Sequence, residues 1–198
     1  FENRSVNAKL LLDQGTGWDV ALHGRYVDSD GTAFPEDSGG PELAVIRDTD
    51  DKAATDTSFG AAGRFALGEA WSLRGVAYRY DHDEDFTSPG IAPGVRDGVP
   101  PRGSQSELAR TYAAANAVWV ASATLRVTFG IDYQRDDGES NGYVELFPGF
   151  RLPNSFELDR DTVGVFAEAQ AEPLAGLTVL GSVRHDDADG ADAETTSR

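Results

Sequence analysis

The stretch PEDSGGP, residues 35–41, has the form in which some proteases present a nucleophilic serine, here Ser38. That chemistry also needs a histidine to accept the serine proton and a buried carboxylate to orient the histidine. His23 is the one histidine before Ser38, and the fifteen residues from His23 to Ser38 cannot hold such a set spread over two barrels. Because Asp, Ser, Gly and Pro favour turns, we interpret the stretch as a loop and predict no enzyme activity.

Two acidic stretches have residue types that bind cations. RDTDDK, residues 47–52, groups three aspartates whose oxygens could bind calcium, and YDHDED, residues 80–85, puts His82 between two aspartates, as in a zinc site. The first has no EF-hand spacing and the second has no further zinc ligands. Solvated acidic loops are therefore favoured, and we predict no metal site and no cofactor.

The composition limits the class of protein. The 198 residues carry 34 acidic against 17 basic side chains, a formal net charge of −17, so nucleic acid is not an expected partner. There is no cysteine and therefore no disulfide. No run of 18 apolar residues is present, so no transmembrane helix is expected, and no signal peptide is expected at the start of the sequence.

Apolar and polar residues alternate along most of the chain. In ATLRVTFGIDYQ, residues 123–134, six apolar residues fall on one face and polar residues or glycine on the other, as in a β-strand. Strands are predicted near residues 4–12, 18–28, 55–67, 71–81, 106–120, 123–134, 160–172 and 177–187. In residues 71–81 the alternation slips and puts Arg79 on the apolar face, which a β-bulge at Gly75 would repair.

Short and long connections alternate between these eight strands. Short turns are predicted near Gly15, Gly68, Ser122 and Ala175, and long loops over residues 29–54, 82–105 and 135–160. All short turns therefore lie at one end of the sheet. The three tryptophans, Trp18, Trp71 and Trp119, lie at that end, and Tyr26, Tyr80 and Tyr133 lie at the other.

This arrangement is typical of an outer-membrane β-barrel, in which two aromatic girdles border an apolar band ~25 Å tall. Small residues such as Ala113, Ala115 and Ala117 lie between the girdles, where lipid rather than large side chains would fill the space. We predict an all-β fold, an antiparallel up-and-down transmembrane β-barrel segment with long extracellular loops. Both ends of the chain would lie at the long-loop side and the last residues would form a loop, so an internal slice of a larger barrel is expected.

Residues 160–187, RDTVGVFAEAQAEPLAGLTVLGSVRHDD, resemble a mid-barrel hairpin of TonB-dependent outer-membrane receptors. FENRSVNAKLLLD at the start resembles an earlier strand of the same family. The resemblance implies a bacterial outer-membrane location and a 22-stranded barrel around a plug domain. It also implies the import of a scarce nutrient, such as a siderophore-iron complex or cobalamin, with energy supplied through TonB. The expected partners are outer-membrane lipid, the plug, TonB and a small nutrient ligand.

The polar-face arginines would line the lumen of such a barrel and are the candidate ligand-binding residues: Arg25, Arg64, Arg74, Arg126 and Arg184. Pairing with lumen carboxylates such as Asp19, Asp132, Glu168 and Asp186, or with a plug, is favoured over direct contact with a ligand. Two alternatives stay open: a self-contained eight-stranded outer-membrane barrel that acts as an adhesin or anchor, and a soluble β-sheet protein.

Overall fold

All nine strands in the described part of the chain form one antiparallel sheet, and an isolated bridge outside it joins Ile91 and Val99. The computed structural model describes residues 1–15, 17–35, 48–91, 98–190 and 193–197. The strands are β1 (Glu2–Asp13), β2 (Trp18–Ala33), β3 (Asp50–Leu67), β4 (Trp71–Ser88), β5 (Arg102–Ser122), β6 (Leu125–Phe147), β7 (Phe150–Leu174), β8 (Leu177–Ala188) and β9 (Glu194–Ser197). Among these residues, no helix is long and apolar enough to cross a membrane.

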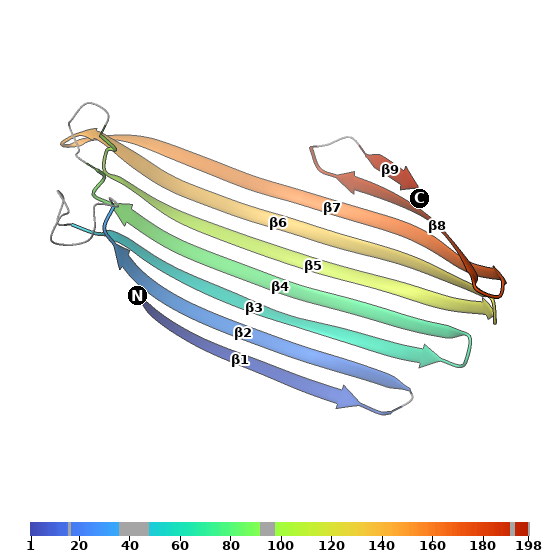
Figure 1. Ribbon diagram of the computed structural model, residues 1–198. Helices are drawn as coiled ribbons and strands as arrows, with labels where there is room; N and C mark the ends of the chain where they lie inside the picture. The colour runs from blue at the N-terminus through green and yellow to red at the C-terminus, as the bar shows by residue number, and fades with distance from the viewer. Residues whose placement is uncertain (16, 36–47, 92–97, 191–192, 198) are drawn as a thin grey trace.

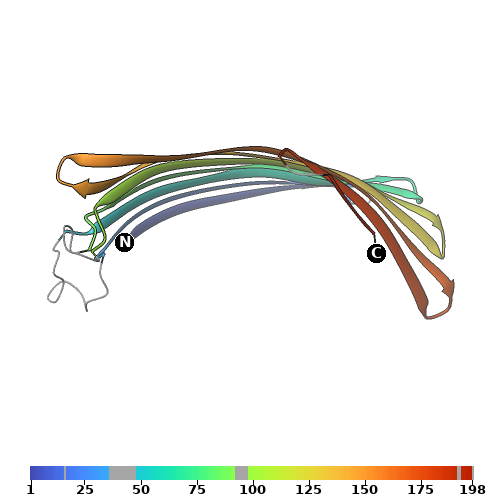
Figure 2. The same ribbon diagram turned by 90° about the horizontal axis from the view of Figure 1, so that it is seen from above.

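The strands lie side by side in chain order, from β1 to β9 (Figure 1). Seen from above, the sheet is curved and strongly twisted rather than flat (Figure 2). β1 pairs only with β2, and β8 pairs with β7 and β9, so the sheet is open. The predicted all-β, up-and-down antiparallel architecture is confirmed.

The predicted long loop over residues 135–160 is wrong. β6 continues to Phe147 and β7 begins at Phe150, so a tight turn with Gly149 in the left-handed region (φ 82°) joins two extended strands. Asp137, Glu139 and Asn141 on one face alternate with Gly138, Ser140 and Gly142 on the other. Neither set is apolar, so the alternation that marks a half-buried strand is missing here.

The predicted C-terminal loop is also wrong in part, because β9 pairs with β8 from Val183↔Ser197 to Asp186↔Glu194. The predicted bulge at Gly75 is absent as well. The register runs without a shift through Gly63↔Gly75↔Ala115. Arg79 therefore stays on the same face as the tryptophans, and Tyr80 lies on the opposite face.

The sheet has almost no hydrophobic core. Val27 and Ala54 are the buried apolar residues of the described chain, while many large apolar side chains are exposed. The hydrogen-bonded ladders between neighbouring strands hold the sheet together, and one whole face lacks an apolar partner within the described residues.

Candidate functional site: the two faces of the sheet

We call the side of the sheet that carries Trp18, Trp71 and Trp119 the Trp face. Cross-strand pairing places Trp18 opposite Phe65 and Trp71 opposite Trp119, so these rings share one surface. The rings of Trp71 and Trp119 stack with centroids 5.7 Å apart and an interplanar angle of 12°. The tryptophans therefore form a row near the short turns, on the side of the sheet that carries the apolar residues.

A band of exposed apolar side chains follows this row along every strand from β1 to β8. Ile131 is 51% exposed, Phe59 56% and Leu10 52%. Between such residues lie small ones, including Ala113, Ala115 and Ala117 of β5. A surface this apolar and this exposed marks an interaction with another apolar phase.

Charged residues set the upper limit of the band. Counted from the short turns, the first Asp, Glu, Lys or Arg on the Trp face of β1 to β8 is, in order, Arg4, Asp28, Asp51, Arg79, Glu107, Arg135, Asp161 and Asp187. At this limit Arg79 Nη2 lies 2.7 Å from Asp81 Oδ1, and Arg135 Nη2 lies 2.9 Å from Asp137 Oδ1. Below the limit, the Trp face of these eight described strands carries no Asp, Glu, Lys or Arg, and its one histidine is His185.

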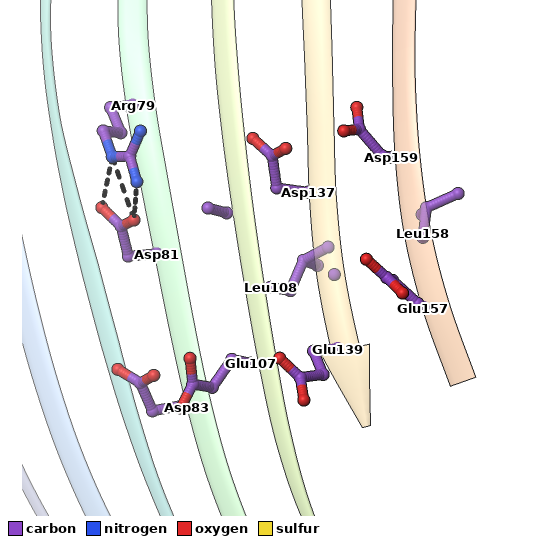
Figure 3. A pocket seen from close by; sticks show the side chains of 12 residues that line it. Arg79, Asp81, Asp83, Glu107, Leu108, Asp137, Glu139, Glu157, Leu158 and Asp159 are labelled. Atoms are coloured by element: carbon purple, nitrogen blue, oxygen red, sulfur yellow. Dashed lines mark hydrogen bonds and ion pairs between the residues drawn. The ribbon is translucent and has the colours of Figure 1, made fainter. Parts of the chain in front are cut away.

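Above the limit the Trp face is acidic. Asp83, Glu107, Glu139 and Glu157 are direct cross-strand neighbours on four successive strands. In the described part of the chain, none of the four lies within ion-pair distance of a basic side chain. They line a hollow of about 500 Å³ with Asp81, Asp137 and Asp159 (Figure 3). Adjacent like charges destabilise a sheet, so this surface is suited to water and counterions.

The opposite side, which we call the Arg face, carries all five predicted lumen arginines: Arg25, Arg64, Arg74, Arg126 and Arg184. Arg64 Nε donates to Asp19 Oδ1 at 2.8 Å. Arg64 and Arg74 are direct cross-strand neighbours. Two neighbouring arginines, on β3 and β4, therefore share one nearby carboxylate, that of Asp19 on β2.

Arg184 reaches across a whole strand. Its two terminal nitrogens donate to the two oxygens of Asp132, both at 2.9 Å, while Nε donates to Asp186 Oδ1 at 2.8 Å. β7 lies between β8 and β6, and Gly164 occupies the crossing point; a Cβ there would collide with the Arg184 guanidinium. The absence of a side chain at Gly164 therefore permits the bidentate contact between Arg184 and Asp132.

Asp136 forms the most buried ion cluster of the Arg face, with 1% of the residue exposed. Arg110 Nε donates to Oδ1 at 2.6 Å, and Oδ2 accepts from Gln134 at 2.8 Å and from Arg160 at 3.0 Å. The hydrogen bond from Arg110 is the main reason why the pKa of Asp136 falls to about 2, against the opposing effect of burial. Sequence reasoning missed this cluster, because it assigned residues 135–160 to a loop.

The two acidic stretches do not assemble as the sequence allowed. β4 places His82 on the Arg face and its neighbours Asp81 and Asp83 on the Trp face. His82 Nδ1 lies 2.9 Å from Asp56 Oδ1, and Nε2 lies 3.4 Å from Glu84 Oε2. Within the described residues, no group of three His, Asp or Glu side chains has the geometry to hold a metal ion. Ser38 lies outside the described residues.

The sequence matches the family described as "TonB dependent receptor-like, beta-barrel" over residues 3–198. Among curated proteins, none matches this chain. The fold resembles that of the ferric yersiniabactin uptake receptor FyuA from Yersinia pestis, with a TM-score of 0.76 and 14% identity over 99% of this chain and 33% of that one. The fold also resembles that of the copper transporter OprC, with a TM-score of 0.70 and 12% identity over 98% of this chain and 32% of that one. For the outer membrane transporter YddB from Escherichia coli, the TM-score is 0.69 and the identity is 11%, over 99% of this chain and 28% of that one. The chain thus spans about a third of the length of these structures.

Proposed function

Because this chain belongs to the TonB-dependent receptor β-barrel family, we propose that it forms part of the wall of an outer-membrane barrel that imports a scarce nutrient. The observation that carries the proposal is the Trp face. An apolar band that begins at a tryptophan row and ends at one charged residue per strand matches the lipid-contacting girdle of such barrels. The Trp face then contacts lipid, and the Arg face lines the lumen.

The proposed whole protein has three further parts: the remaining strands, a plug domain in the lumen, and TonB as the energy source. The open edges of the sheet support an incomplete barrel over a closed eight-stranded one, since β1 and β8 do not pair. The five arginines are proposed to face the plug or the nutrient, and Ser38 is proposed to have no catalytic role. For the cargo we propose a small chelate, such as a siderophore-iron complex, or cobalamin.

The proposal fixes which end of the sheet faces the cell exterior. Single cysteines at Asp48, Gly98 and Pro148, near the loop ends, are expected to react with a membrane-impermeant maleimide in intact cells. Cysteines at Glu69, Ala123 and Ala175, in the short turns, are expected to react only after the outer membrane is opened. The chain has no native cysteine, so the background is zero for these residues.

Each outcome of the labelling experiment has a distinct meaning. Equal labelling of both sets would indicate a protein free in solution and would reject the membrane barrel. The reversed pattern would keep the barrel but would place the loop ends of β6 and β7 in the periplasm. That orientation contradicts the proposed import route.

A further inference from the structure

One edge of β7 has no neighbouring strand over the half that lies nearer the β6–β7 turn. On one side β7 pairs with β6 as far as Phe147↔Phe150. On the other side, within the described residues, its pairing with β8 ends at Thr162↔Ala188, and β9 pairs with β8 at a level further from the β6–β7 turn. The β8–β9 hairpin therefore ends partway along β7, and residues 150–161 extend beyond it (Figure 1).

One hydrogen bond shows which backbone groups point to this free edge. The carbonyl oxygen of Asp161 accepts from the backbone N–H of Asp189 at 2.9 Å, on the β8 side. In an antiparallel strand the N–H and C=O of one residue point to the same side, and the side alternates along the strand. The pairing with β6 has no register shift from Asp161 to Ser155. The backbone groups of Ser155, Glu157 and Asp159 therefore point to the free edge, which can act as a template for a further strand.

The side chains along this edge differ between the two faces. On the Trp face, Glu157 and Asp159 are both exposed, and Asp159 Oδ2 lies 3.3 Å from Arg135 Nη2. On the Arg face, Phe156 is 62% exposed and Leu158 follows it on the same side of the sheet. A strand added at this edge would place its alternate side chains beside carboxylates and beside apolar groups.

The basic side chains near the edge are already paired. Arg135 forms ion pairs with three carboxylates of the Trp face. Arg151 pairs with Glu145, and Arg160 on the Arg face donates to Asp136. The Trp face of the edge therefore keeps an excess of negative charge. A second copy of the same edge would be repelled, and a basic segment would be attracted.

We propose that the free edge of β7 binds an extended peptide segment of another protein, in which basic and apolar residues alternate. The peptide adds to the sheet as a strand. Its basic residues lie opposite Glu157 and Asp159, and its apolar residues lie opposite Phe156 and Leu158. Backbone hydrogen bonds to β7 supply affinity, and the alternation supplies specificity. The inference goes beyond import and uses the proposed barrel only for location, since this end of β7 then lies outside the cell.

The test uses the intact receptor, purified in detergent, and measures binding by the fluorescence anisotropy of a labelled peptide. The probe is a short peptide, blocked at both ends, in which lysine and valine alternate. A peptide with glutamate in place of each lysine is expected not to bind. Glu157→Lys is expected to weaken binding of the probe about tenfold or more, because like charges then lie opposite each other.

Glu107→Lys is the matched control. Glu107 lies on the same face and in the same cross-strand row as Glu157, but on β5, two strands away from the free edge. Its charge is screened from the edge at physiological salt, so the affinity of Glu107→Lys for the probe is expected to stay within about twofold of the wild type.

N-methylated peptides test the backbone pairing. The peptide residues opposite Glu157 and Asp159 direct their N–H groups to β7, so N-methyl groups on the lysines are expected to abolish binding. N-methyl groups on the valines are expected to leave binding intact. Equal binding of the two methylated peptides, equal affinity of the wild type and Glu157→Lys, binding of the glutamate peptide, or no binding of the probe to the wild type would each overturn the inference.

Sedimentation separates a peptide from a second copy of the receptor as the occupant of the edge. The wild type is expected to sediment as a monomer in detergent. A dimer that the Glu157→Lys variant does not form would show that a second copy occupies the edge, and would overturn the inference.

The two proposals fail in different ways. If cysteine labelling shows the expected topology while the wild type does not bind the probe, only the inference falls. If labelling contradicts the topology, the proposed function falls, while peptide binding by the purified receptor is still measured directly.

Discussion

At the scale of single residues, Asp136 shows how this sheet keeps a charge out of solvent. A buried carboxylate is tolerated only when it is paired and fully hydrogen-bonded. Arg110, Arg160 and Gln134 together satisfy both of its oxygens. Because these partners come from β5, β6 and β7, one carboxylate ties three strands together on the face that lacks an apolar band.

Asp136 makes stability depend on pH in a defined window. Its pKa is lowered from 3.8 to about 2 in the folded protein, so its contribution is present above pH 4 and is lost as the pH falls from about 4 to 2. The shift corresponds to about 2 kcal/mol. Urea unfolding of the intact receptor in lipid vesicles is expected to show Asp136→Asn less stable than the wild type at pH 7.

The difference between wild type and Asp136→Asn is expected to close near pH 2, since the amide does not titrate. A constant difference between the two proteins from pH 7 to pH 2 would show that the ion cluster does not contribute in this way. The other carboxyl groups titrate in both proteins and cancel in the comparison.

Part of the polar face could be predicted residue by residue. Period-two alternation places Arg64 with Asp19, and Arg184 with Asp132 and Asp186, on one face, and the structure pairs them. Alternation does not reveal the register, that is, which residues of neighbouring strands lie opposite each other. The span of Arg184 across Gly164 therefore could not be read from the sequence.

At the scale of the strand, the two faces change character at Arg79 and Arg135. Below this level the Trp face is apolar and the Arg face polar. Above it the Trp face carries acids, while Leu108, Phe156 and Leu158 lie on the Arg face. Sequence reasoning took the slip at Arg79 for a bulge, because it assumed that one face stays apolar along a whole strand. A change of surroundings, from lipid to water in the proposed barrel, explains the slip without any shift in register.

β5 offers a matched test of its two faces. Ala115 lies on the Trp face and Ala114 on the Arg face, opposite Asp132. Ala115→Arg is expected to destabilise the intact receptor in lipid vesicles by about 2–4 kcal/mol, as for a charge near the middle of the bilayer. Ala114→Arg is expected to cost about 1 kcal/mol or less, as measured by urea unfolding.

Depth provides a further control for this comparison. Ala109→Arg, on the Trp face next to the charged limit at Glu107, is expected to cost about 1 kcal/mol or less, because it lies near the interface. Equal costs at Ala115 and Ala114 would contradict the assignment of the Trp face to lipid.

At the scale of the whole molecule, successive short turns are displaced along the strand direction from one side of the sheet to the other. The register forms one continuous row: Asp19, Arg64, Arg74, Asn116, Gly130, Phe166 and Arg184. The first short turn follows Asp13↔Asp19, level with this row, whereas the fourth follows Leu174↔Leu177, about seven residues below it. At ~3.3 Å per residue and ~4.8 Å per strand spacing, this step over six spacings corresponds to a tilt of roughly 40°. Closed barrels have strand tilts of about 35–45°.

The isolated chain is expected not to form a stable soluble monomer. Its outer strands have unpaired edges, which favour association with other chains, and its Trp face exposes a continuous apolar band. Residues 1–198 expressed alone in detergent-free buffer should sediment as aggregates in analytical ultracentrifugation. A single monomeric species with a cooperative urea transition would count against a membrane barrel.

The contact of Arg184 with Asp132 across Gly164 also constrains how this sequence can evolve. A side chain at 164 would displace the guanidinium, which is the flexible end of Arg184, and so would disturb its contact with Asp132. The same constraint applies to Gly130 and Phe166, because the Phe166 ring occupies the space that a Cβ at Gly130 would fill. Related sequences that keep the long side chain of a pair are therefore expected to keep its glycine.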